Sequence, residues 1–239
     1  MRDFFRRLMG GAALAGVLSG GALAGDWPEI KQVSFSADNA RVLVQTAWQQ
    51  DGSGFSRASL GLYDTGTGRA LLRLNSFSEN PEVTPAQLLG RMTQGQTQRL
   101  KQAGLLGRPA NQPRFVATVP GRTLPQPQWS DAVRAGQSKT YSVFLWSRNV
   151  PIELKVQPSK VACAYAGLLP AGEKPATFTL KVNGQTIPTP QNPAVECAAR
   201  YTLDRVDLSG NRVLLTVRAY APGFEGPNAM PIFLAATLR

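Results

Sequence analysis

Short apolar stretches separated by turn-forming residues recur along most of this 239-residue chain. Four of them fall within residues 31–74, with turns between them that contain Asp, Asn and Gly. The residues of Arg41–Trp48 (RVLVQTAW) favour a strand, and those of Asp64–Gly68 (DTGTG) favour a turn. Strands joined by such short turns pair in the antiparallel sense. We therefore expect an antiparallel meander at the start of the folded chain.

The same pattern returns after residue 138. Further strands are expected at 139–147, 152–156, 177–182, 200–208, 212–220 and 231–238. Asn183-Gly184 is a strong signal for a two-residue hairpin turn, and Ser209-Gly210-Asn211 predicts a second tight reversal. The predicted fold class is mainly β, with antiparallel meanders that form a β-sandwich or a partial-barrel or propeller-like core.

One helix is expected near residues 84–104. Thr84 suits the N-cap, Pro85 the first helical position and Gly104 the position after the last turn. Residues 108–128 contain five prolines and predict a connector, with a short strand at 115–119. We divide the chain accordingly into residues 1–24, 25–119 and 120–239, and the two β halves form either one continuous core or two.

The N-terminal segment has the features of a secretory signal peptide. Arg2, Arg6 and Arg7 precede an apolar stretch over residues 8–23, which ends at Ala22-Leu23-Ala24. This predicts cleavage after Ala24 and a periplasmic or secreted protein. The alternative is an uncleaved anchor, but the stretch is rich in Gly and shorter than the roughly 20 residues that span a bilayer. No transmembrane segment is expected after cleavage.

The charge of the chain favours anionic partners. Removing the predicted signal leaves 23 basic and 14 acidic residues, a net charge of +9. An anionic cell-envelope polymer or another envelope protein would suit this charge. The alternative is that the scattered arginines lie on solvated faces. No nucleic-acid partner is expected, because no pattern typical of such proteins accompanies the basic residues.

The chain has two cysteines, Cys163 and Cys197, and no histidine. In an exported protein an even number of cysteines favours a disulfide. A zinc site would lack the histidines to complete it. We expect a disulfide, no metal site and no cofactor.

The absence of histidine also excludes Ser-His-Asp, Cys-His and His-metal mechanisms. Asp204 and Asp207 are three apart on a predicted strand, so we expect them on opposite faces as solvated residues. Glu225 lies between two glycines and is either a turn residue or the acid of a hydrolase. We expect no catalytic site; the alternative is a cryptic carboxylate-dependent hydrolase of envelope polymers.

Aromatic residues offer a possible binding surface beside the turns of both β halves. The candidate binding residues are Trp48, Phe55, Arg57, Tyr220, Phe224 and Glu225. If the two sets of turns lie side by side, they would line a groove for sugar rings or an extended peptide. The alternative is that Trp48, Tyr63 and Tyr220 are core or cross-strand residues.

Two resemblances add to this interpretation. Residues 35–38, 51–54 and 62–68 resemble one blade of a TolB-type, WD-like β-propeller, although a propeller needs at least about four blades. With Gly223-Phe224-Glu225-Gly226-Pro227 near its end, the whole chain resembles an uncharacterised family of bacterial predicted secreted proteins. This resemblance implies export and transfers no active site. We expect an envelope-associated binding module, or else an assembly factor that uses a sheet edge.

Overall fold

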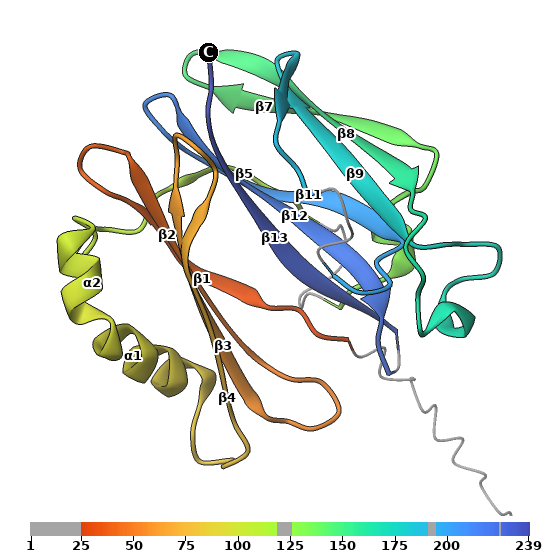
Figure 1. The fold of residues 1–239 in the computed structure, drawn as a ribbon, viewed down its shortest axis with the longest axis horizontal. Coiled ribbons are helices and arrows are strands. Elements are labelled where there is room, and N and C mark those ends of the chain that lie inside the picture. The colour runs from red at the N-terminus through yellow and green to blue at the C-terminus, as the bar shows by residue number, and fades with distance from the viewer. Residues whose placement is uncertain (1–24, 119–125, 191–194, 225) are drawn as a thin grey trace, which may run out of the picture.

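The computed structural model describes residues 25–118, 126–190, 195–224 and 226–239. Three antiparallel sheets make up most of the fold, accompanied by two α-helices and two short 3₁₀ helices (Figure 1). The prediction of a mainly β fold is confirmed. Neither α-helix has the length or the hydrophobicity needed to cross a bilayer.

Sheet A is the meander predicted at the start of the chain. Its strands pair in chain order: β1 (Glu29–Phe35), β2 (Arg41–Gln49), β3 (Ser56–Asp64) and β4 (Ala70–Ser78). Asn39, in the turn between β1 and β2, has a φ of 57°, a conformation that Asn tolerates better than most residues. β4 is one edge of this sheet.

The later strands form two further sheets. Sheet B has the order β13 (Pro227–Thr237), β12 (Arg212–Pro222), β11 (Arg200–Ser209) and β5 (Pro113–Val116), and β6 (Val133–Arg134) also pairs with β11. Sheet C has the order β10 (Gln185–Ile187), β9 (Ala176–Val182), β8 (Arg148–Pro158) and β7 (Ser138–Leu145). The 3₁₀ helices are η1 (Trp129–Asp131) and η2 (Ala166–Leu168).

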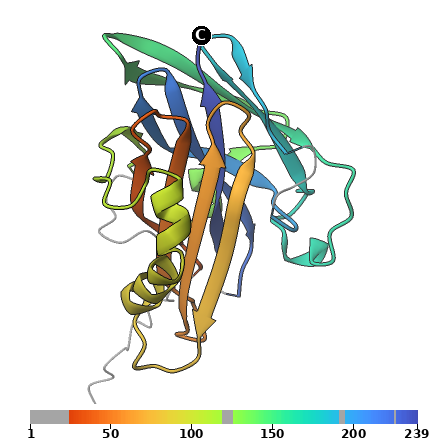
Figure 2. The ribbon, with the colours of Figure 1, turned by 60° about the vertical axis from the view of Figure 1, so that its left-hand side comes forward.

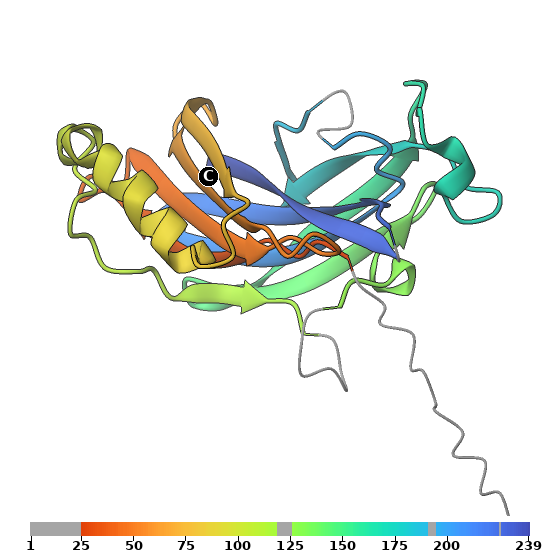
Figure 3. The same cartoon turned by 90° about the horizontal axis from the view of Figure 1, so that it is seen from below.

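Sheet B lies between the other two sheets. Residues 213–221 of β12 are all buried, as expected of a strand that is covered on both faces. Val213 and Leu215 pack in the core shared with sheet C, whereas Leu214 packs with Val42 and Tyr63 of sheet A. Figure 3 shows sheet B between sheet C on one side and sheet A with its helices on the other. Residues of both β halves thus pack together in the cluster between sheets A and B, while the division at residue 119 stays a prediction because 119–125 lie outside the described residues.

Two helices replace the single helix predicted near 84–104. They are α1 (Pro85–Gly95) and α2 (Thr97–Gln102), and they are separated at Gln96, whose φ is −109° and ψ 11°. Thr84 caps α1 as predicted, since its hydroxyl accepts from the Gln87 backbone N–H at 3.2 Å. The break lets each helix turn its leucines towards sheet A: Leu88 of α1 and Leu100 of α2 are both buried. Figure 2 shows both helices lying along one face of this sheet.

Candidate functional site

A groove of about 770 Å³ lies between sheet A and the edge of sheet B. β1, β2 and the Tyr63 end of β3 pack against sheet B, and the groove lies between the rest of β3, β4 and β13. The groove walls come from β2–β4, from β13 and from residues 188–190 and 195. Its lining includes Trp48, Tyr63, Arg73, Asn75, Pro188, Met230 and Phe233.

One candidate binding residue, Trp48, lines the sheet A wall, and a second, Arg57, lies beside it on the neighbouring strand. Trp48 and Arg57 are direct cross-strand partners on β2 and β3. The Arg57 guanidinium lies 5.1 Å from the centre of the Phe77 ring and donates twice to the Gln50 side chain, at 2.8 and 2.5 Å. A row of aromatic and cationic side chains therefore runs across three strands, while Phe55 is half-buried at the end of the turn between β2 and β3.

The opposite wall is the outer edge of β13, and its backbone direction follows from two contacts. The Ala229 N–H donates to Asp26 O at 2.8 Å, and Thr237 O accepts from Gln185 Nε2 at 2.7 Å. β13 pairs with β12 without a bulge, so odd-numbered residues between these points face the same way. Phe233 therefore directs its backbone N–H and C=O away from β12. No described residue forms a hydrogen bond with either group.

The open part of this edge is short. Pro231 offers a carbonyl but no N–H. Further along, the Ala235 carbonyl is covered by Gly68, where an added Cβ would lie 2.8 Å from the oxygen. Proline and covering turns are common ways to limit pairing at sheet edges. The edge can thus pair with only a few residues of another chain, centred on Phe233.

Arg73 is the charged side chain among the residues that line the groove. Its guanidinium lies 5.8 Å from the centre of the Tyr63 ring, close enough for a cation–π contact. Burial raises the pKa of Tyr63, and Arg73 opposes this rise, so the phenol is neutral near pH 7. The groove therefore combines an aromatic and proline-rich lining with one positive charge.

The remaining candidate residues do not gather in this groove. Tyr220 is buried in sheet B at 1% exposure, whereas Phe224 is 91% exposed on the turn between β12 and β13. At this exposure Tyr220 lies in the interior, as the alternative interpretation expected, and its role in binding stays a prediction. Glu225 lies outside the described residues.

The turns of the two halves are nevertheless connected, through Asp26. The Asp26 carboxylate accepts from the Asp51 N–H at 2.8 Å, and the Asp26 N–H donates to the Asn228 side chain at 2.8 Å. Burial raises the pKa of Asp26, and the Asp51 N–H opposes this effect. The Trp48 indole N–H is close to this carboxylate and is buried without forming a hydrogen bond.

Asp204 and Asp207 are buried, so the expectation of solvated residues on opposite faces was wrong. The register of β11 shifts between Leu203 and Arg205; such a bulge brings both carboxylates to the face that is turned towards sheet A. Asp204 is 3.0 Å from Nε of Arg218, and Asp207 accepts from Arg205 at 2.7 and 2.9 Å. Each carboxylate forms an ion pair with an arginine, so both residues have a structural role in the interior of the protein.

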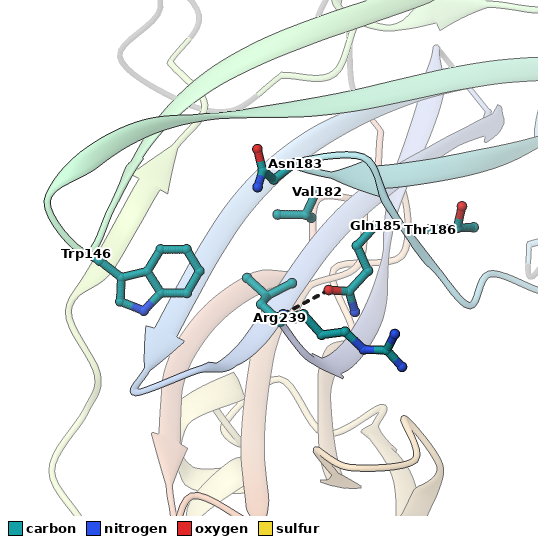
Figure 4. A pocket seen from close by; sticks show the side chains of 7 residues that line it. Trp146, Val182, Asn183, Gln185, Thr186 and Arg239 are labelled. Atoms are coloured by element: carbon teal, nitrogen blue, oxygen red, sulfur yellow. Dashed lines mark hydrogen bonds between the residues drawn. The ribbon is translucent and has the colours of Figure 1, made fainter.

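A second hollow, of about 440 Å³, lies beside the C-terminal strand (Figure 4). Trp146 has a φ of 53° and donates its indole N–H to Gly210 O at 2.9 Å. Gln185 donates to Thr237 O at 2.7 Å and accepts from the Arg239 N–H at 3.0 Å. The Trp146 indole thus holds the turn between β11 and β12, and the Gln185 amide holds the end of β13. Because these polar groups are already used, this hollow is a weaker candidate for a binding site.

The predicted disulfide between Cys163 and Cys197 is confirmed, with Cα atoms 5.0 Å apart. Within the described ranges, no group of three or more Cys, Asp or Glu side chains could hold a metal ion. Phe233 and Arg73 were not among the binding residues predicted from the sequence. Pro231 could have indicated that the strand around Phe233 lies at a sheet edge, because proline within a strand is typical of edge strands.

One family model, described as "Predicted secreted protein (DUF2259)", matches residues 44–237. The chain belongs to this family. A search of curated proteins finds no match. Membership agrees with the predicted export and with a β-rich fold, whereas no finding supports a TolB-type repeat. Cleavage after Ala24 stays a prediction, since residues 1–24 lie outside the described residues.

Proposed function

We propose that this DUF2259 member is a non-catalytic binding protein of the cell envelope, and that its groove holds an extended segment of another envelope protein. The observation that carries the proposal is the unpaired N–H and C=O of Phe233 at the groove wall. An extended segment laid along β13 would form hydrogen bonds with both groups, which is the usual way a peptide adds to a sheet edge. Cleavage after Ala24 would leave the groove intact, because its lining begins at Pro28.

The groove lining supports a particular class of segment. Trp48, Tyr63 and Phe233 offer apolar surface, and alternate side chains of an added strand would point towards the sheet A wall. Arg73 would favour an acidic side chain or a terminal carboxylate there. The +9 charge of the mature chain would also raise the rate at which an acidic partner is captured.

The alternative of a carboxylate-dependent hydrolase has less support. Asp204 and Asp207 are buried and paired with arginine, and neither lines the groove. Glu225, the acid proposed for this hydrolase, lies outside the described residues. We therefore give priority to binding.

Selection from a random peptide library displayed on phage tests the proposal, with the oxidised chain of residues 25–239 as bait. Asn75 is exposed on the groove face of β4, so Asn75→Trp should fill the groove without disturbing the core. Selected peptides are expected to bind this variant at least about tenfold more weakly than the unmodified protein, since one well-packed side chain contributes about that much.

Thr140→Trp is the matched control, because Thr140 is exposed on sheet C and lies outside the groove lining. Amide exchange at Phe233 should slow when a selected peptide is added. If no peptide is selected, or if selected peptides bind the Asn75→Trp variant as tightly as the control, the proposal fails.

A further inference from the structure

The loop between β8 and β9, residues 159–175, presents apolar side chains to solvent. Val161, Tyr165 and Leu168 are 45%, 56% and 63% exposed. The residues between them are alanines, one glycine and Cys163. Apart from the Tyr165 hydroxyl, these eight consecutive residues have no hydroxyl, amide or charged side chain. A soluble protein seldom exposes such a stretch without a partner for it.

This loop is held in place at three points. The Ser159 N–H donates to Pro175 O at 2.8 Å and closes its base. The disulfide joins Cys163 to Cys197, which is 3% exposed. Leu169 is buried. The apolar side chains at 161, 165 and 168 therefore project from a tethered loop.

The exposed charges of the loop are both positive. Lys160 and Lys174 flank the apolar stretch and are exposed. Glu173, the acid of the loop, has a side chain only 7% exposed and forms ion pairs with Arg200 and Arg134. Its negative charge is thus neutralised within the fold. The outward surface of the loop combines apolar and cationic groups.

A further exposed aromatic lies at the same end of the protein. Ala199, two residues after Cys197, donates its N–H to Tyr220 O at 2.9 Å, so the disulfide lies beside the end of β12. Phe224, 91% exposed, follows on the turn to β13. Figures 1 and 3 both place this turn and the 159–175 loop towards one end of the molecule.

We propose that the 159–175 loop docks this protein on the surface of an anionic lipid bilayer. Tyr165 and Leu168 would enter the boundary between headgroups and acyl chains, where aromatic and aliphatic side chains are favoured. Lys160 and Lys174 would remain at the level of the anionic headgroups, each contributing electrostatic attraction. The chemistry favours lipid over a protein partner, because the stretch offers a single side-chain hydroxyl for the hydrogen bonds of a protein interface. This inference is independent of the groove.

Co-sedimentation with vesicles tests it, using the oxidised chain of residues 25–239. Binding is expected with vesicles of phosphatidylcholine mixed with phosphatidylglycerol, and much less with phosphatidylcholine alone. Tyr165→Ser combined with Leu168→Ser should weaken binding by about tenfold or more. Lys160→Gln and Lys174→Gln should each weaken it by about fivefold. These side chains are exposed, so the variants should unfold at the same urea concentration as the unmodified protein.

Leu106→Ser combined with Phe144→Ser is the matched control, because these side chains are 49% and 54% exposed on other parts of the surface. The control should bind as the unmodified protein does. Three results would overturn the proposal: no binding to phosphatidylglycerol vesicles at low salt, equal losses in the control and the loop variant, or binding that depends on the lysines but not on Tyr165 and Leu168. A protein that fails this test can still bind peptides in the groove, so the two proposals are separable.

Discussion

The guanidinium carbon of Arg218 lies 3.8 Å from the centre of the Trp27 ring. Arg218 is 2% exposed, and its Nη1 donates to Pro28 O at 3.1 Å and to Ala229 O at 3.0 Å. One side chain of β12 therefore connects the segment before β1 with the start of β13. Together with the Asp204 carboxylate 3.0 Å from its Nε, Arg218 forms a buried polar centre between sheets A and B.

Arg218→Met is expected to lower the free energy of unfolding by about 3–5 kcal/mol, because it leaves Asp204 buried without its partner. Urea unfolding of the mature chain measures this loss. Arg134→Met is the matched control: its ion pair with Glu173 has an arginine side chain that is 53% exposed, so the loss should stay below about 1 kcal/mol. Equal losses in the two variants would contradict a central role for Arg218.

Replacing Cys163 and Cys197 together with serine should lower the free energy of unfolding by roughly 3–4 kcal/mol. The two residues are 34 apart in sequence, and opening a loop of this length restores that much entropy to the unfolded chain. Reducing agent should destabilise the unmodified protein by a similar amount and leave the double variant unchanged. A double variant that still responds to reductant would show that another effect is being measured.

Asp26 should make the protein less stable as the pH rises. Burial raises its pKa above the ordinary value of 3.8, so the folded state retains this proton to a higher pH than the unfolded state does. Between the two pKa values, the free energy of unfolding falls with increasing pH. Asp26→Asn cannot ionise, and should therefore gain stability relative to the unmodified protein between about pH 3 and pH 7, as measured by urea unfolding.

Asp64 provides a control, because its effect on stability should change with pH in the opposite direction to that of Asp26. The Thr67 N–H donates to its carboxylate at 2.7 Å and lowers its pKa. The ionised form is thus favoured in the folded state, and its contribution is present above pH 3.8 and lost as the pH falls through the folded-state pKa. Asp64→Asn should lose stability relative to the unmodified protein as the pH rises. The difference in free energy of unfolding between each variant and the unmodified protein is plotted against pH. Slopes of the same sign for Asp26→Asn and Asp64→Asn would contradict the opposite pKa shifts of these two carboxylates.

Gly68→Ala should separate the β3–β4 turn from β13. Gly68 has a φ of 73°, and an added Cβ would lie 2.8 Å from Ala235 O. Gly172 has a φ of 77° with nothing within 4 Å of an added Cβ. Gly172→Ala should therefore cost about 1–2 kcal/mol for the left-handed conformation alone, and Gly68→Ala at least about 1 kcal/mol more. The stability of the two variants is compared by thermal unfolding. Equal losses of stability would mean that the β3–β4 turn moves away from β13 without cost.

Several features were predictable because they depend on neighbouring residues. The turns at Asn39 and Asn183-Gly184, the N-cap at Thr84 and the antiparallel meander follow from local backbone preferences. The disulfide followed from an even number of cysteines in a chain with an export signal. The break at Gln96 was missed, because the apolar spacing of residues 88–100 suits one helix as well as two.

Other features depend on contacts between distant residues. The burial of Asp204, Asp207 and Tyr220 depends on the covering of sheet B on both of its faces. The backbone of Phe233 is open because β13 is the edge strand of sheet B and faces the groove, a relation between sheets that no stretch of sequence contains.

The sequence alone determined the elements: the antiparallel strands, most of their turns, and the covalent link between Cys163 and Cys197, which the predicted export favours. Local backbone preference and the alternation of apolar residues are sufficient to determine the strands and the turns. The tertiary structure alone decided which faces meet. β12 carries apolar side chains on both faces, although Arg218 interrupts one of them, so its pattern permits packing on either side. Only the arrangement of the three sheets leaves the groove at β13 and the apolar loop at 159–175 open to partners.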